Sequence, residues 1–316
     1  MNQFKHVNAT SVSEAASLLG GGNAAPIAGG TDLLTTLIDY INPTQPETLV
    51  NLKTIPDLDY IKEEGGMLKI GALTKLTAIA ESSVVNGKWS ALAEAAGKVA
   101  TPQIRNQGTI GGNLCQESRC WYYRSANNYF HCFRKGGVIC QAVPGNNTYH
   151  AILGGEVCFT PFPSDTAIPL FAMEATIVTN KKSIAIADFF VTLGNTMDDD
   201  EIVTEIQVPE PASGTKQLYS RYAVRKSFDF PVSSVAIVAS MSGSTVSDCR
   251  IVLGGCVTRP WRVTGAEDEL NGNAISESTA EAAAEAAVDG AMALPYNKWL
   301  VQLTKTLVKR AILSMA

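Results

Sequence analysis

Two glycine-rich turns constrain the fold of this chain more than any other feature of its sequence. The first, Gly29-Gly30-Thr31-Asp32, separates a strand-like segment of small residues from a helix-like segment. The second, at 105–113, combines three glycines with a hydroxyl and several amides. Adjacent glycines let consecutive backbone N–H groups point into one concavity, and a helix that starts there adds partial positive charge, which suits a pyrophosphate. Neither turn matches the dinucleotide fingerprint or the P-loop, and tight turns that need a positive φ would also account for each of them.

Strand-like and helix-like segments alternate in the first two thirds of the chain. The predicted elements lie at 24–29, 31–41, 48–55, 66–74, 89–100, 166–180 and 201–209. Thr31 or Asp32 is placed to cap the N-terminus of the helix at 31–41. Between about 113 and 158 the periodicity disappears, and aromatic residues, Asn-rich turns and clustered cysteines replace it. This stretch is therefore interpreted as an insertion that something other than a hydrophobic core holds together.

A polar segment rich in Pro and Gly, at 209–217, predicts a linker. Beyond it, the segments 232–243 and 247–256 form an apparent hairpin, and two or three helices follow, in the segments 264–272, 277–291 and 297–315. Strands followed by helices predict a separate α+β domain. We therefore expect a first domain at 1–210, which carries the insertion, and a second at 216–316.

Composition excludes several classes of protein. The 316 residues include 46% hydrophobic and 17% charged residues, enough apolar material for two packed domains. A formal net charge of −5 provides no basic footprint for a nucleic acid. No apolar run is long enough for a membrane span, and the N-terminus lacks the pattern of a secretory signal, so a cytoplasmic location is expected.

Five of the seven cysteines fall within the insertion, at Cys115, Cys120, Cys132, Cys140 and Cys158. They contain no C-x-x-C pair, the usual signature of zinc sites. A disulfide framework fits poorly with a cytosolic chain, and the neighbouring Arg and Lys residues make the stretch too polar for a core. Cationic surroundings and an aperiodic loop favour a metal–thiolate site, with a [4Fe–4S] cluster, a zinc ion or redox disulfides as the alternatives.

The motifs PIAGGTDLL (26–34), IRNQGTIGGNL (104–114) and Pro163-Ser164-Asp165, together with the final α+β domain, resemble the FAD-binding medium subunit of the molybdenum hydroxylases, the xanthine dehydrogenase and aldehyde oxidoreductase family. The resemblance covers essentially the whole chain. The insertion at 113–158 is similar to the subset whose flavoprotein carries an extra [4Fe–4S] cluster, which includes a periplasmic aldehyde oxidoreductase and 4-hydroxybenzoyl-CoA reductase. The implied fold is α+β: a vanillyl-alcohol-oxidase-type FAD-binding domain of two subdomains with an iron–sulfur insertion loop, then a domain with a three-stranded sheet and helices.

The resemblance also assigns residues to the cofactors. The implied FAD contacts are Pro26, Ile27, Ala28, Gly29, Gly30, Thr31, Asp32, Leu33, Leu34, Thr109, Gly112, Asn113, Asp165, Val203 and Arg221. Arg221 stands where the family usually has lysine, so its geometry differs. The implied cluster ligands are Cys120, Cys132, Cys140 and Cys158, with Cys115 as a spare. In the reductase pattern the fourth ligand falls at Tyr149, which is not a ligand here. His131 and His150 are alternative ligands, although ordinary loop histidines are favoured.

The family implies a function in electron transfer. A partner subunit with a molybdenum cofactor oxidises the substrate, [2Fe–2S] centres in a small subunit pass electrons on, and FAD with the [4Fe–4S] cluster connects them to an external acceptor or donor such as NAD or ferredoxin. No catalytic residues are expected in this chain, because no convincing general base is found among its three histidines. The alternatives are a stand-alone FAD oxidase, the medium subunit of an aromatic acyl-CoA reductase, and a zinc-tied scaffold. Periplasmic members of the family travel with a signal-bearing partner, which leaves that location open.

Overall fold

A computed structural model describes all residues from Met1 to Ala316. The N-terminal part is built on a small parallel sheet with the strand order β1-β3-β2. Its strands and the helices around it are β1 (Lys5–Asn8), α1 (Val12–Gly20), β2 (Ala24–Ile27), α2 (Leu33–Ile38) and β3 (Thr48–Asn51). Ser11 caps α1 by accepting a hydrogen bond from the backbone of Glu14. A separate cluster of buried apolar residues fills this part, so it forms its own small subdomain.

The second part is a five-stranded antiparallel sheet in the order β4-β5-β10-β6-β7. Its strands are β4 (Ile61–Glu64), β5 (Met67–Gly71), β6 (Thr176–Thr179), β7 (Ser183–Ala185) and β10 (Val203–Pro209). The helices of this part are α3 (Leu76–Glu81), α4 (Ser83–Lys88), α5 (Ser90–Lys98), α6 (Pro102–Arg105), α7 (Ile110–Leu114), α8 (Ala167–Ala172) and α9 (Ile186–Phe189). A two-stranded hairpin, β8 (Phe190–Val191) with β9 (Gly194–Asn195), follows α9. The predicted arrangement of two subdomains in the first part of the chain is confirmed.

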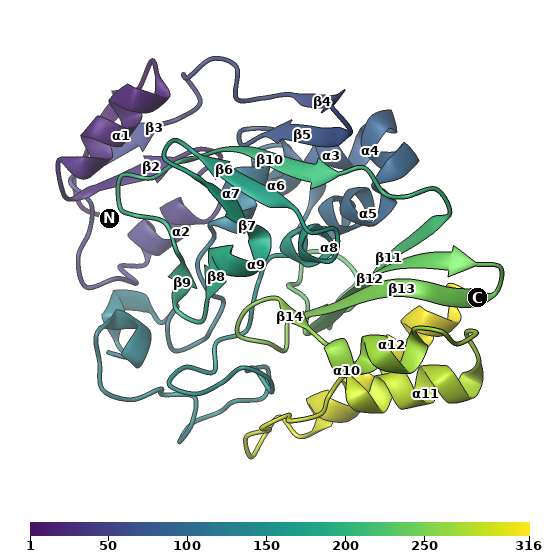
Figure 1. The fold of residues 1–316 in the computed structure, drawn as a ribbon. Helices are drawn as coiled ribbons and strands as arrows, with labels where there is room; N and C mark the ends of the chain where they lie inside the picture. The colour runs from purple at the N-terminus through teal and green to yellow at the C-terminus, as the bar shows by residue number, and fades with distance from the viewer.

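The C-terminal part carries an antiparallel sheet in the order β11-β12-β13-β14 with helices packed on it (Figure 1). The elements are β11 (Thr215–Tyr222), β12 (Ser233–Ser242), β13 (Thr245–Gly254), β14 (Trp261–Arg262), α10 (Thr264–Leu270), α11 (Glu277–Ala286) and α12 (Trp299–Leu313). The predicted sheet-and-helix arrangement is confirmed. The sheet has four strands where three are expected. The additional strand, β14, is only two residues long and has no clear pattern in the sequence.

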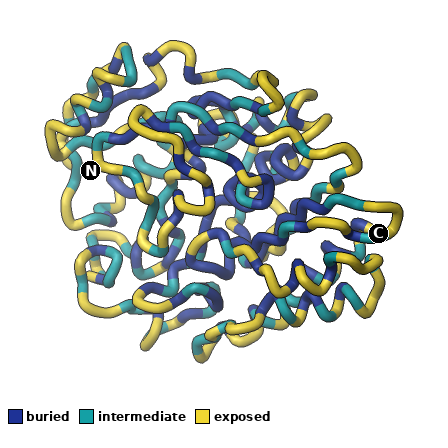
Figure 2. Tube along the Cα trace, in the orientation of Figure 1, coloured by how far each residue is buried: buried dark blue, intermediate teal, exposed yellow.

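The insertion forms a lobe of loops below α2 and beside the β8–β9 hairpin (Figure 1). Its regular structure is limited to two 3-10 turns, η1 (Ala126–Asn128) and η2 (Phe133–Lys135). The buried apolar cluster of the lobe has four members, and two of them are Cys120 and Cys132. Exposed and intermediate residues make up most of its trace (Figure 2). The lobe therefore has almost no conventional core, as the sequence predicts.

One large apolar core joins the second and C-terminal parts. It extends from Leu68 and Ile70 on β5 to Val308 and Ile312 on α12. Helix α8 contacts both β12 and β13 of the C-terminal sheet. None of the helices is long and apolar enough to span a lipid bilayer.

Candidate functional site

The two glycine loops lie directly against each other. A Cβ atom on Gly29 would overlap the carbonyl oxygen of Gln107 and would stand 3.1 Å from the Cα of Gly108. The hydroxyl of Thr31 also lies near Gly108. Gly30 has a φ of +70°, a left-handed conformation that favours glycine, and the side chains of Ile27 and Leu34 flank it. The missing side chain at Gly29 is therefore what allows the loops to meet.

The second loop is fixed at its helical end. The Thr109 hydroxyl caps α7 by accepting a hydrogen bond from the backbone N–H of Gly112 at 3.1 Å. The side-chain oxygen of Asn113 accepts hydrogen bonds from Ser164 at 2.6 Å and from Thr166 at 2.7 Å. These bonds bring the predicted residues Thr109, Gly112 and Asn113 next to the segment that contains Asp165.

Asp165 is buried and lies in contact with Arg221. The guanidinium of Arg221 donates to Asp165 Oδ2 at 2.9 Å, and the Tyr219 hydroxyl donates to the other carboxylate oxygen. Burial raises the pKa of Asp165 to about 6, although the positive charge of Arg221 opposes the rise. Val203 is buried at the start of β10. The structure therefore brings two of the predicted FAD residues together as a buried ion pair.

Asp32 does not have the role that its position in the sequence suggests. The predicted capping of α2 by its side chain, or by that of Thr31, is wrong, because α2 has no side-chain cap. The Asp32 carboxylate instead accepts hydrogen bonds from Arg119, from Arg124 at 2.6 Å and from the backbone N–H of Glu117 at 2.8 Å. These partners lie far along the chain in the insertion. Asp32 therefore ties the first glycine loop to the cysteine-rich lobe, and we call this set of bonds the Asp32 clasp.

The four cysteines assigned to a cluster line one cavity in the lobe. Aromatic and polar side chains complete its wall: the residues other than cysteine are Tyr122, Tyr123, Phe133, Arg134, Gln141, Ala142 and Thr160. Cys120, Cys132 and Cys158 are buried, and Cys140 is partly exposed. Cys115 lies outside this cavity and is exposed. Tyr149 packs between Trp121 and Trp299.

The thiols of this cavity influence one another, and none of the seven cysteines forms a disulfide. A hydrogen bond from Cys158 lowers the pKa of Cys140 to about 6, and the same contact together with burial raises the pKa of Cys158. Burial raises the pKa of Cys120 to about 11. The Sγ of Cys120 lies 3.2 Å from Nε2 of His150. No three His, Cys, Asp or Glu side chains are arranged to share one metal ion.

The cationic residues of the lobe differ in their partners. Arg119 and Arg124 bind Asp32, and Arg134 lies 3.3 Å from the carboxylate of Glu117. Lys135 is only 8% exposed, and its ammonium donates to the carbonyl oxygen of Ile41 at 2.9 Å with no carboxylate partner. Burial lowers the pKa of Lys135, and negative charge on Cys132 and Cys120 opposes that change.

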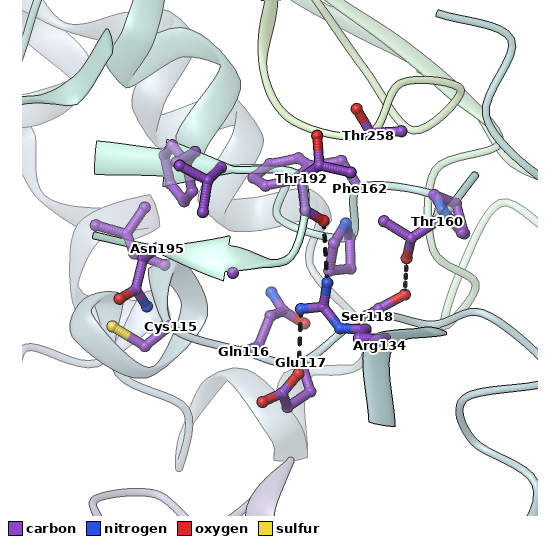
Figure 3. A pocket seen from close by; sticks show the side chains of 16 residues that line it. Cys115, Gln116, Glu117, Ser118, Arg134, Thr160, Phe162, Thr192, Asn195 and Thr258 are labelled. Atoms are coloured by element: carbon purple, nitrogen blue, oxygen red, sulfur yellow. Dashed lines mark hydrogen bonds and ion pairs between the residues drawn. The ribbon is translucent and has the colours of Figure 1, made fainter. Parts of the chain in front are cut away.

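A second pocket lies between the insertion and the β8–β9 hairpin (Figure 3). Arg134 and Thr160 line both this pocket and the cysteine cavity. Arg134 donates to the carbonyl oxygen of Thr192, and Ser118 bonds to Thr160 (Figure 3). No local sequence pattern marks the hairpin, because its partner Arg134 is distant along the chain.

Comparison with known proteins decides the family. The model described as "FAD binding domain in molybdopterin dehydrogenase" matches residues 2–128 and 145–211, more than half of the chain. The chain belongs to this family. The model of the carbon monoxide dehydrogenase flavoprotein C-terminal domain matches residues 219–299. The FAD-binding model passes over residues 129–144, the part of the lobe that contains Cys132 and Cys140. The chain is an FAD-binding protein of the oxidoreductase class, and its membership of this family confirms the prediction that it binds FAD.

Relatives with known roles are similar over most of their length. The aldehyde oxidoreductase FAD-binding subunit PaoB of Escherichia coli (strain K12) is 32% identical, with 78% of each chain covered. The carbon monoxide dehydrogenase medium chain of Hydrogenophaga pseudoflava is 31% identical, with 90% of this chain and 86% of the relative covered. The structure of carbon monoxide dehydrogenase from Hydrogenophaga pseudoflava that lacks the Mo-pyranopterin moiety matches with a TM-score of 0.77 and 28% identity, and 98% of this chain and 96% of that chain are covered. Quinoline 2-oxidoreductase from Pseudomonas putida 86 matches with a TM-score of 0.78 and 25% identity over 99% and 96% of the two chains.

Proposed function

We propose that this chain is the electron-transfer flavoprotein subunit of a molybdenum-containing dehydrogenase or hydroxylase. Membership of the FAD-binding family supports this function, as do relatives named as FAD-binding subunits or medium chains of such enzymes. Bound FAD supplies the ability to accept electrons one at a time and to release them as a pair. The single observation on which the FAD site rests is the contact between the two glycine loops, which only a residue without a side chain permits at Gly29.

The FAD-binding residues in this proposal are those that the sequence assigns. Gly29 lets the first loop pack against the backbone of Gln107 in the second loop, and the Thr109 cap holds the second loop in place, so that backbone N–H groups of both loops would bind the pyrophosphate. Asn113, through Ser164 and Thr166, positions the segment of Asp165. The Asp165–Arg221 pair adds a fixed charge distribution beside the site, and Val203 provides an apolar contact.

We further propose that the cysteine cavity holds a [4Fe–4S] cluster. Four cysteines are the ligands that such a cluster takes, and each of them binds a different iron. Four cysteines line the cavity in the lobe and supply this set of donors.

Charge supports the same assignment. A buried lysine without an anionic partner is costly, because desolvation disfavours the ammonium. Lys135 is such a residue, and the thiolates of Cys120 and Cys132 are its nearest source of negative charge. A four-thiolate iron centre carries net negative charge and would compensate Lys135.

The partners follow from the proposed complex. They are a large subunit with the molybdenum cofactor, a small subunit with [2Fe–2S] centres, and an external acceptor or donor such as NAD or ferredoxin. Within the chain, residues 1–210 would form the FAD-binding domain and 216–316 the C-terminal domain, and a cytoplasmic location is expected. Because the cluster lies in the lobe at 113–158, electrons would leave or enter this subunit through that lobe.

Cofactor analysis of the complex tests the proposal. The chain is purified anaerobically with its partner subunits, and FAD, iron, acid-labile sulfide and zinc are measured per chain. We expect about one FAD and about four irons bound to this subunit after separation from the others. Zinc near one per chain without iron would refute the cluster and favour the scaffold alternative. Oxidation of a substrate by the isolated chain would favour a stand-alone oxidase.

A further inference from the structure

His150 lies at the edge of the cysteine cavity without being one of the assigned ligands. Its side chain is buried, with 2% of the residue exposed. Its Nε2 atom stands 3.2 Å from the Sγ of Cys120. No other side-chain nitrogen is hydrogen-bonded to any of the four cavity cysteines. This contact singles out one sulfur of the four.

The backbone of His150 is held from the lobe and from the C-terminal part, and aromatic rings of the lobe flank its imidazole. The backbone N–H of His150 donates to the carbonyl oxygen of Asn147, and the side chain of Asn297, just before α12, donates to the carbonyl oxygen of His150, both at 2.9 Å. Trp121 meets the ring edge-on with centroids 6.2 Å apart, and the ring of Tyr122 lies 5.7 Å away. The position of His150 is therefore set by the fold and does not depend on the contact with Cys120.

The direction of the hydrogen bond follows from the donors that are available. A cysteine bound to iron is a thiolate, which has no proton and only accepts. The other ring nitrogen of His150, Nδ1, is buried and has no hydrogen-bond partner. A proton on Nδ1 would be a buried donor without an acceptor, whereas a proton on Nε2 points at the sulfur.

We propose that His150 donates its Nε2–H to the Sγ of Cys120 and thereby raises the reduction potential of the cluster. This inference rests on the [4Fe–4S] site proposed above. Hydrogen bonds to a ligating sulfur stabilise the more negative, reduced state, and they are among the factors that set cluster potentials. His150 is then a positioning residue that tunes the cluster, and neither a ligand nor an ordinary loop histidine.

The test is a redox titration of the intact complex followed by the EPR signal of the reduced cluster. Three variants are compared with the wild type. His150→Phe removes the donor and keeps an aromatic ring, and His150→Gln keeps a side-chain N–H. His131→Phe changes an exposed histidine of the same lobe and is the matched control. Iron and FAD contents are measured for each protein.

We expect the midpoint potential to shift to a more negative value in His150→Phe, to shift less in His150→Gln, and to stay at the wild-type value in His131→Phe. Iron and FAD contents are expected to be unchanged in all three variants. An unchanged potential in His150→Phe with full iron content would overturn the inference. Loss of iron from both His150 variants, with full iron in the control, would also overturn it and would make His150 a ligand or a structural requirement. Absence of iron from the wild type would instead refute the proposed cluster itself.

Discussion

Replacement of Gly29 by alanine tests the contact between the glycine loops directly. The added Cβ would overlap the carbonyl oxygen of Gln107 and would stand 2.8 Å from its carbonyl carbon and 3.1 Å from the Cα of Gly108. Favourable contacts between carbon atoms begin at about 3.5 Å. All three neighbours are backbone atoms, so no side-chain rotation relieves the overlap. The loops must therefore move apart.

The loss of stability expected for Gly29→Ala follows from the cost of adding atoms to a well-packed site. An extra methyl group in a well-packed site costs about 1–3 kcal/mol, and for chains of this size each kcal/mol lowers Tm by about 2–4 °C. We expect Gly29→Ala to lose most of its FAD and to unfold about 2–12 °C below the wild type. FAD content is measured from the flavin released per chain, and unfolding is followed by the fluorescence of the four tryptophans.

Gly87→Ala is the matched control for this change. Gly87 lies in the short helix α4, and a Cβ atom there would have no neighbour within 4 Å. The control is expected to retain FAD and to unfold at or slightly above the wild-type temperature, because alanine favours helix. Full FAD content and an unchanged Tm in Gly29→Ala would refute the argument that the two loops need a bare backbone to meet.

Three further predictions concern the lobe and the buried acid. Cys132→Ser should lose the cluster iron and its broad absorbance but keep FAD. Cys115→Ser should keep both the iron and FAD. Loss of FAD from Cys132→Ser would show that the lobe is integral to the FAD site. Asp32→Asn removes the anion of the clasp and should destabilise the protein by about 1–3 kcal/mol and expose the lobe to limited proteolysis, while unchanged cleavage would contradict the clasp. Burial raises the pKa of Asp165 to about 6 from 3.8, so protonation favours the folded state. The free energy of unfolding in urea is measured for the wild type and for Asp165→Asn. The advantage of the wild type should be greatest below pH 4 and should fall as the pH rises through 6. A difference that does not depend on pH would contradict the raised pKa of Asp165.

Much of the fold is visible in local sequence patterns. The hairpin of β12 and β13 and the three C-terminal helices lie where alternation and helical periodicity predict them. The insertion is also recognisable, because the loss of periodicity coincides with a lobe that has almost no core. Local patterns succeed here because the spacing of apolar residues reflects the surface that each element buries.

The contacts that define the site are of a different kind. Asp32 is placed to cap a helix, yet it binds Arg124, which is 92 residues away. The family pattern assigns Arg221 and Asp165 separately to the cofactor, and only the fold shows that they pair with each other. The sequence offers His150 as an alternative ligand, whereas the structure places it against the sulfur of Cys120. A single sequence carries no record of such pairings, since the partners are brought together only after the domains have packed.

The bonds from the start of α12 to the lobe have a consequence for how the protein matures. Asn297 donates to the backbone of His150, and the backbone of Tyr296 donates to the side chain of Asn147. A ribosome releases the cysteine-rich segment well before it makes these C-terminal residues, because synthesis runs from the N-terminus. The cavity therefore reaches its final shape only after Tyr296 and Asn297 have left the ribosome, so iron would be inserted after the C-terminal domain has been made at least that far.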